Sequence, residues 1–307
     1  MRGSMETLLQ NAKPEPLVYL HYTQRELDRN FDQRTWAGNA LEVIGRYGER
    51  SALARKRLDH QSIAYGDTTS EVLDVFPAAR PNAPVLVFVH GGAWRNFTRK
   101  DFSFAANALV PAGITVVVPG FASLPQVGLL EMVAQVRRAI DWTCANVKSI
   151  GADADAVHVA GWSSGAHLAA TALIADCEDT ASLAARVRSI TCISAPFDLE
   201  PVMLSARSSY VKITREEARG FSPRWNVERY RTPIVVISAE RDTDEFRRQS
   251  DDFTAALRRV GRAGEHVVFP GVNHFELIDT LGDADSALAR FLISRLKRPP
   301  APPSGCS

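Results

Sequence analysis

Hydrophobic residues along the chain gather into short runs that alternate with segments of helical periodicity. The runs at 84–89, 114–118, 156–160, 190–194 and 234–238 are mainly apolar and rich in β-branched residues, which is typical of strands buried on both faces. Between the second and third runs, residues 129–144 repeat hydrophobic positions at the spacing of one helix face. This alternation predicts an α/β fold with a mostly parallel central sheet and helices on both faces.

The flanking and interrupting segments have other patterns. Thr23 with Glu26 has the spacing of a capping box, and Asn39 with Glu42 predicts the start of a second helix. Two leading strands are expected at 62–65 and 71–76. Residues 196–233 break the rhythm, with a short helix beginning at Thr214 and stopped by Ser222-Pro223. We expect a lid-like insertion at about 197–230, with a plain surface excursion as the alternative.

The expected organisation is one domain with two tails. Residues 1–20 are assigned to an N-terminal tail, in which Met1–Ser4 resemble an expression-vector remnant, and Met5 is then the expected native start. Residues 21–297 form the predicted domain, because a single α/β domain of this size is common. Residues 298–307 are rich in proline and are predicted to be a disordered tail.

A serine between two glycines marks the junction of a predicted strand and helix. Gly161-Trp162-Ser163-Ser164-Gly165 follows the run at 156–160 and opens a helix of small residues. This pattern alone arises by chance, but the strand before and the helix after are the context of a nucleophile elbow. Ser163 is therefore the candidate nucleophile.

A second glycine motif follows the run at 84–89. In hydrolases with a nucleophile elbow, a loop at the position of His90-Gly91-Gly92-Ala93-Trp94 supplies backbone N–H groups. These groups stabilise the negatively charged oxygen that forms when the nucleophile attacks a carbonyl. We expect the donors of this oxyanion hole to be Gly92, Ala93 and Ser164. His90 is interpreted as a structural histidine of the loop.

Candidates for the acid and the base come later in the chain. The run at 234–238 leads to Asp242, and the short strand at 267–269 leads to His274. The order Ser, Asp, His, with acid and base each beyond a strand, is that of the α/β-hydrolase fold. Ser163, Asp242 and His274 are the predicted triad, with Glu240 and Asp244 as competitors for the role of the acid.

Composition narrows the class of protein. The chain of 307 residues has 36 basic and 35 acidic residues, so we expect neither nucleic acid nor a charged membrane as a partner. Transmembrane and secretory patterns are not found. The four cysteines have no metal-ligand spacing. We therefore expect a cytoplasmic protein with no cofactor and no metal, and leave a homodimer open.

The chain resembles the arylformamidases, or kynurenine formamidases, of the α/β-hydrolase fold. The resemblance covers roughly residues 20–295 and is carried by five segments: His90–Arg95, Gly161–Leu168, Tyr22–Asp28, Phe197–Pro201 and Asp244–Ser250. It implies the same triad and hydrolysis of an N-formyl arylamine such as N-formylkynurenine. Two departures concern the substrate: Trp162 replaces the histidine usual in such relatives, and Phe121–Pro125 differs from the expected tyrosine-containing loop.

Aromatic residues cluster on the loops that should surround the serine. We expect Trp94, Phe121, Trp162, Phe197 and Phe275 to contact a flat aryl substrate, although each is individually more typical of packing. A carboxylesterase, or a hydrolase of carbamates or other aryl amides, is the alternative within enzymes. A hydrolase-fold binding protein without catalysis is the alternative from another class, which the complete triad disfavours.

Overall fold

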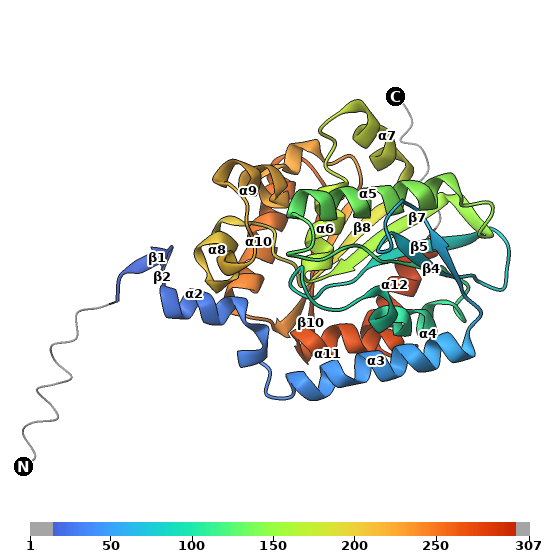
Figure 1. Ribbon diagram of the computed structural model, residues 1–307, viewed down its shortest axis with the longest axis horizontal. Coiled ribbons are helices and arrows are strands. Elements are labelled where there is room, and N and C mark those ends of the chain that lie inside the picture. Colours follow the sequence, from blue (N-terminus) through green and yellow to red (C-terminus); the bar gives the residue numbers. More distant parts are fainter. Residues whose placement is uncertain (1–14, 299–307) are drawn as a thin grey trace, which may run out of the picture.

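Eight strands form one sheet in the computed structural model, which describes residues 15–298 (Figure 1). In sheet order they are β10 (Gly264–Asn273), β9 (Ile234–Arg241), β8 (Ser189–Ile193), β7 (Ala152–Trp162), β5 (Ala83–Val89), β6 (Thr115–Pro119), β4 (Val72–Phe76) and β3 (Gln61–Ala64). Neighbours from β10 to β6 run parallel, while β4 is antiparallel to both β6 and β3. The predicted mostly parallel sheet is confirmed.

Helices cover both faces of this sheet. They are α2 (Gln24–Phe31), α3 (Ala40–Arg57), α4 (Ala106–Leu109), α5 (Leu129–Ala145), α6 (Ser164–Ala172), α7 (Glu178–Arg186), α8 (Glu200–Leu204), α9 (Arg215–Phe221), α10 (Asp244–Arg259), α11 (His274–Asp279) and α12 (Ala287–Leu296).

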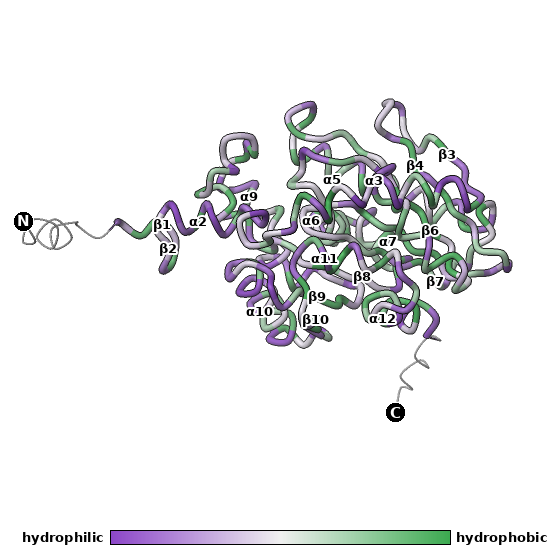
Figure 2. The backbone as a smooth tube through the Cα atoms, turned by 90° about the horizontal axis from the view of Figure 1, so that it is seen from below, coloured by the Kyte–Doolittle hydropathy of each residue, from purple (hydrophilic) through white to green (hydrophobic). Residues whose placement is uncertain are grey.

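Alternate residues of the central strand serve two separate hydrophobic cores. In β5, Val85, Val87 and Val89 pack with α5, α6 and α10, whereas Leu86 and Phe88 pack with α3, α4 and α12. Both cores are needed because successive strand residues point to opposite faces. Figure 2 shows the consequence: hydrophobic residues follow the inner strands, and hydrophilic residues gather on the outer helices α2 and α10.

The predicted helices and strands are found, with differences at their ends. β7 and β10 are longer than the apolar runs, because β7 begins with partly exposed residues and β10, at the edge of the sheet, is partly exposed along most of its length. The capping box at Thr23 is formed and begins α2. Asn39 begins α3 but makes no side-chain cap; its side-chain Nδ2 instead donates to Glu276 Oε1 at 2.6 Å. Helices α4, α7, α8, α11 and α12 were not predicted.

The interruption between β8 and β9 folds into short helices. α8, α9 and three 3₁₀ turns occupy this stretch, and α9 begins at the predicted N-cap, Thr214. α8 packs on α2, so the insertion and the N-terminal segment contact each other. A two-stranded hairpin, β1 (Leu17–Tyr19) and β2 (Tyr22–Thr23), precedes α2 (Figure 1).

The predicted vector remnant at Met1–Ser4 and nearly all of the proline-rich tail lie outside the described residues. Among residues 15–298, no helix is long and apolar enough to cross a bilayer.

Candidate active site

Ser163 sits on a strained turn between β7 and α6. Its φ of +54° lies in the left-handed region, which is unusual for a residue other than glycine. Directly after this turn, α6 approaches the end of β5 very closely. Only glycine is accommodated at position 165, because a Cβ at Gly165 would lie 2.2 Å from the carbonyl oxygen of His90. Strain of this kind persists where the surrounding structure fixes it, and functional sites are where it clusters. The turn places the Ser163 side chain in a cavity at the carboxyl edge of the sheet.

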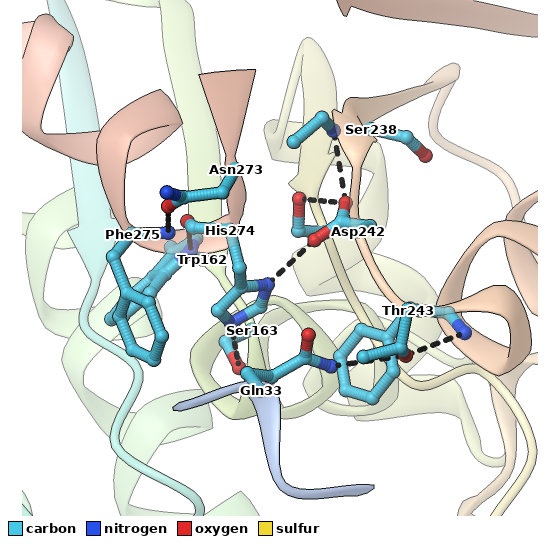
Figure 3. A network of polar contacts seen from close by, with 12 residues as sticks. Gln33, Trp162, Ser163, Ser238, Asp242, Thr243, Asn273, His274 and Phe275 are labelled. Carbon is cyan, nitrogen blue, oxygen red and sulfur yellow. Dashed lines mark hydrogen bonds and ion pairs between the residues drawn. The ribbon is translucent and has the colours of Figure 1, made fainter. Parts of the chain in front are cut away.

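His274 connects Ser163 to Asp242 (Figure 3). Ser163 Oγ lies 3.1 Å from His274 Nε2, and His274 Nδ1 lies 2.8 Å from Asp242 Oδ1. His274 begins α11 directly after β10, and Asp242 follows β9 by one residue. All three side chains are buried. The structure thus brings the three predicted residues into one hydrogen-bonded chain.

Asp242 is held by further hydrogen bonds at its second oxygen. Ser194 Oγ donates to Oδ2 at 2.6 Å, and the backbone N–H of Ala239 donates to it at 2.9 Å. A buried carboxylate needs such partners because burial removes its hydration. The competing acids lie elsewhere: Glu240 accepts from the N–H of Gly271, and Asp244 pairs with Arg247.

Free backbone N–H groups lie beside the serine. Among the described residues, no backbone acceptor takes the N–H of Gly92, Ala93 or Ser164. Gly92 and Ala93 line the same cavity as Ser163. Gly92 has a φ of +120°, and a Cβ there would lie 2.0 Å from the carbonyl oxygen of Asn96, so only glycine fits this turn. The N–H of Trp94 donates to Ser164 Oγ at 3.1 Å, which ties the loop to the elbow.

The five predicted aromatic contacts separate into two groups. Trp162 and Phe275 line the cavity beside His274 (Figure 3). Trp162 is nevertheless 1% exposed, and its Nε1 donates to the His274 carbonyl at 3.2 Å, so most of its ring supports the triad from behind.

Trp94, Phe121 and Phe197 lie outside the cavity lining, contrary to the expectation of substrate contact. The indole of Trp94 turns inward and donates to His167 Nδ1 at 3.2 Å. Phe121 stacks on His90, and Phe197 stacks on Phe253, with ring centroids 4.4 and 4.3 Å apart. These three rings pack against neighbouring side chains of the protein instead of facing the cavity.

Two buried histidines hold the loops without touching the triad. His90 Nδ1 lies 2.9 Å from the Gly91 carbonyl, as expected for a structural histidine. His167 Nε2 lies 3.0 Å from the Phe221 carbonyl, and its Nδ1 accepts from Trp94. Burial lowers the pKa of each to about 4 because the charged form loses its hydration.

The cavity has a volume of about 630 Å³ and an outer wall that the sequence did not reveal. The N-terminal segment contributes Phe31, Gln33 and Arg34 to this wall, and the insertion contributes Arg207 and Tyr210. Local patterns show only that these segments are helical. Their positions over the serine depend on packing between segments far apart in the chain.

Two polar groups of this wall are unpaired. Gln33 Oε1 and Arg207 Nη1 are buried and have no hydrogen-bond partner among the described residues. A buried polar atom without a partner is uncommon in folded proteins. Both atoms belong to residues that line the cavity.

Metal ligands are not grouped in the part of the chain that the structure describes: no three His, Cys, Asp or Glu side chains are arranged to hold an ion. Cys144, Cys177 and Cys192 are free thiols.

Known proteins resemble this chain in sequence and in fold. The BD-FAE family model matches residues 73–257. A kynurenine formamidase from Salmo salar is 30% identical over 88% of this chain and 96% of its own length. One from Danio rerio is 28% identical over 76% of this chain and 80% of its own length. The esterase LipC from Mycobacterium tuberculosis is 30% identical over 78% of this chain and 66% of its own length.

A solved esterase from Pyrobaculum calidifontis superimposes with a TM-score of 0.67 at 19% identity, covering 88% of this chain and 97% of that one. At this identity, the likeness shows the shared fold.

Proposed function

We propose, for a chain that belongs to the BD-FAE family of α/β hydrolases, that hydrolysis proceeds through an acyl-enzyme on Ser163. Its similarity to kynurenine formamidases identifies the chain as an arylformamidase-like hydrolase. The residues that react and the substrate are the content of our proposal. One observation supports the assignment above the others: a continuous hydrogen-bonded chain from Ser163 through His274 to Asp242.

The geometry suits nucleophilic attack on a carbonyl carbon. His274 Nε2 removes the Ser163 proton as Oγ attacks, and Asp242 holds the imidazole in the required tautomer and stabilises its charged form. The negative oxygen that forms is met by the N–H groups of Gly92, Ala93 and Ser164. His274 then gives the proton to the leaving group, and water releases the acyl group by the same steps.

The preferred substrate in this proposal is an N-formyl arylamine, with N-formylkynurenine as the first choice. An amine leaves poorly until it is protonated, so the reaction depends on His274 as general acid. An arylamine leaves more readily than an alkylamine because the ring delocalises the nitrogen lone pair. The kynurenine formamidase relatives support this choice of substrate.

Short-acyl aryl esters are the second candidate. Esterases are among the relatives, and LipC is as similar in identity as the Salmo salar formamidase. Ester cleavage uses the same residues but needs no protonation of nitrogen. The two candidates therefore differ in the leaving group and share the acyl-enzyme.

Replacing the nucleophile tests the mechanism. Ser163→Ala should lower kcat/KM by at least about 10³-fold on every substrate that the parent cleaves, without lowering the melting temperature. An organophosphate should label Ser163 in the parent and leave the variant unlabelled. Activity close to that of the parent in the Ser163→Ala variant would overturn the assignment.

Kinetics on three substrates test the choice of leaving group. We expect the parent to cleave N-formylkynurenine and formanilide with higher kcat/KM than p-nitrophenyl acetate, relative to the uncatalysed rate of each. Cleavage of the ester alone would replace the formamidase proposal with the carboxylesterase.

A further inference from the structure

We propose that Arg95 and Arg207 form a binding site for an anionic group of the substrate, a carboxylate in the simplest case. This inference rests on the proposed function and narrows it to substrates that carry a negative charge away from the scissile bond. Both arginines line the cavity that contains Ser163 and His274.

Arg207 has an incomplete set of partners. Its Nε and Nη2 both donate to the carbonyl oxygen of Phe31, at 3.0 and 2.5 Å, while Nη1 is buried without an acceptor. Its charged group packs between the rings of Phe31 and Trp94, 5.5 and 5.7 Å from their centroids. Aromatic faces and one carbonyl oxygen stabilise the charge only in part.

Arg95 is held near Arg207 because the loop after β5 and the insertion each stack an arginine on an aromatic ring of the other. Arg95 stacks over Tyr210 at 4.7 Å, and Arg207 stacks over Trp94, the residue that precedes Arg95. Tyr210 is joined to Arg207 by a backbone hydrogen bond of 3.1 Å. Two cations are thus held together where two loops of the wall meet.

No acidic side chain of residues 15–298 forms an ion pair with either arginine. The two carboxylates of the cavity have other partners. Asp32 pairs with Arg34, and Asp28 accepts from the side chain of Gln24 and the backbone N–H of Ala206. The lining therefore has three arginines and two aspartates, and its excess charge is positive.

The guanidinium group suits a planar anion. Burial lowers the pKa of Arg207, but an arginine remains protonated in proteins. Guanidinium N–H groups bind carboxylates through two parallel hydrogen bonds, and such charge-assisted bonds are stronger than neutral ones. A carboxylate at the junction of the two loops would supply the acceptor that Nη1 lacks and balance the excess charge.

A matched pair of substrates isolates the effect of the charge. N-formylkynurenine and its carboxamide differ only in the anionic group, so their ratio of kcat/KM reports on its recognition. We expect the parent to prefer the acid by roughly 10- to 100-fold, the range for hydrogen bonds to charged groups. Arg207→Met should remove most of this preference, and Arg95→Met should reduce it by about three- to tenfold.

Two further variants guard against trivial explanations. Lys212→Met removes the same charge from the same insertion, at an exposed residue outside the cavity lining, and should leave the preference unchanged. Because Arg207 also links the insertion to Phe31 through two hydrogen bonds, Arg207→Met could disturb the fold, whereas Arg95 is exposed and contacts the insertion only through its stack on Tyr210. The Arg95 variant and a partial rescue by Arg207→Lys therefore test charge recognition separately.

Binding measurements separate this inference from the proposed reaction. In Ser163→Ala, calorimetry would compare ω-phenylalkanoates of two to four methylenes with their matched amides. Tighter binding of the acids that is lost in the Ser163→Ala, Arg207→Met double variant supports the site even if no formamide is cleaved. Equal affinity for acids and amides, or equal loss of both on replacing Arg207, would overturn it.

Discussion

The three side chains Ser163, His274 and Asp242 at the carboxyl edge of the sheet and the side chains of the wall that faces them differ in how fully their polar atoms are paired. At the edge, Ser163, His274 and Asp242 satisfy one another, and Asp242 has two further donors. On the wall, Gln33 and Arg207 each leave a buried polar atom without a partner. Polar side chains that are paired with one another hold a fixed geometry, whereas an unpaired polar atom of a residue that lines a cavity is available to bind a ligand. This difference supports our proposal that the edge carries out the reaction and that the wall selects the substrate.

The two regions also differ in how the chain builds them. The edge arises where strands end, so a strand, a tight turn and a helix place each reacting group within a few residues. The wall brings α2 and the insertion together although they lie far apart in the sequence.

Among variants that keep Ser163, His274 and Asp242, the largest effect is expected from crowding the edge. A Cβ at Gly165 would lie 2.2 and 2.3 Å from the carbonyl oxygens of His90 and Val89, so α6 could not keep its close approach to β5. Gly165→Ala should destabilise the protein by about 2 kcal/mol or more and reduce hydrolysis of all substrates at least 100-fold. Urea unfolding and kinetics measure the two effects.

Gly45→Ala is the matched control, at a glycine away from the edge. Gly45 lies inside α3, and a Cβ there would meet no atom within 4 Å. The same substitution should stabilise the protein by about 0.5–1 kcal/mol, because alanine loses less conformational entropy in a helix. A similar change in stability for both variants would contradict the close packing at Gly165.

A moderate effect is expected at Ser194, which supports the edge without touching a substrate. Ser194→Ala removes the 2.6 Å hydrogen bond to Asp242 and leaves the donor at Ala239 in place. Because a hydrogen bond to a buried charged group contributes about 1.5–3 kcal/mol, kcat/KM should fall roughly 10- to 100-fold. The loss should be the same on amides and esters, and on charged and neutral substrates.

This uniform loss sharpens the contrast with Arg207, whose replacement should act on charged substrates alone. Ser250→Ala is the control, since Ser250 is equally buried but bonds only within α10. Kinetics on a charged and a neutral formamide suffice. If Ser194→Ala lowered kcat/KM more for the charged than for the neutral formamide, the proposed separation of roles between the edge and the wall would be contradicted.

The sequence predicted the sheet and the three residues of the edge because both follow from local patterns. Apolar runs marked each central strand, and the turn at Ser163 required glycines that are visible in the sequence. The aromatic contacts were harder. Trp94, Phe121 and Phe197 stand on the expected loops, but whether a ring turns toward a cavity depends on its neighbours in space.

The wall could not be predicted for the same physical reason. Arg207 and Gln33 lie in short helical segments with no motif, and only tertiary packing leaves them facing the cavity. Helix α11 was missed because it is only six residues long and begins directly at His274, whereas the helical spacing of Leu288, Leu292 and Leu296 in α12 is visible in the sequence.

The smallest effect is expected at His167, which joins the two regions. Its Nδ1 accepts from Trp94 beside the oxyanion loop, and its Nε2 donates to the carbonyl of Phe221 in the insertion. Burial lowers the pKa of His167 to about 4, from about 6.5 in an unfolded chain. Below pH 6.5 the unfolded state therefore binds a proton that the folded state resists, and stability is lost as the pH falls toward 4. Protonation would also place a hydrogen on Nδ1, where it would repel the Trp94 N–H.

Urea unfolding of the parent should show a free energy of unfolding that is constant from pH 8 to 7 and falls at lower pH, with His167 contributing up to about 1.4 kcal/mol per pH unit. His167→Gln keeps a donor and an acceptor but cannot titrate, so its curve should fall less steeply between pH 6 and 5. Parallel curves for the parent and His167→Gln would show that this histidine does not couple the pH to the junction of the two regions.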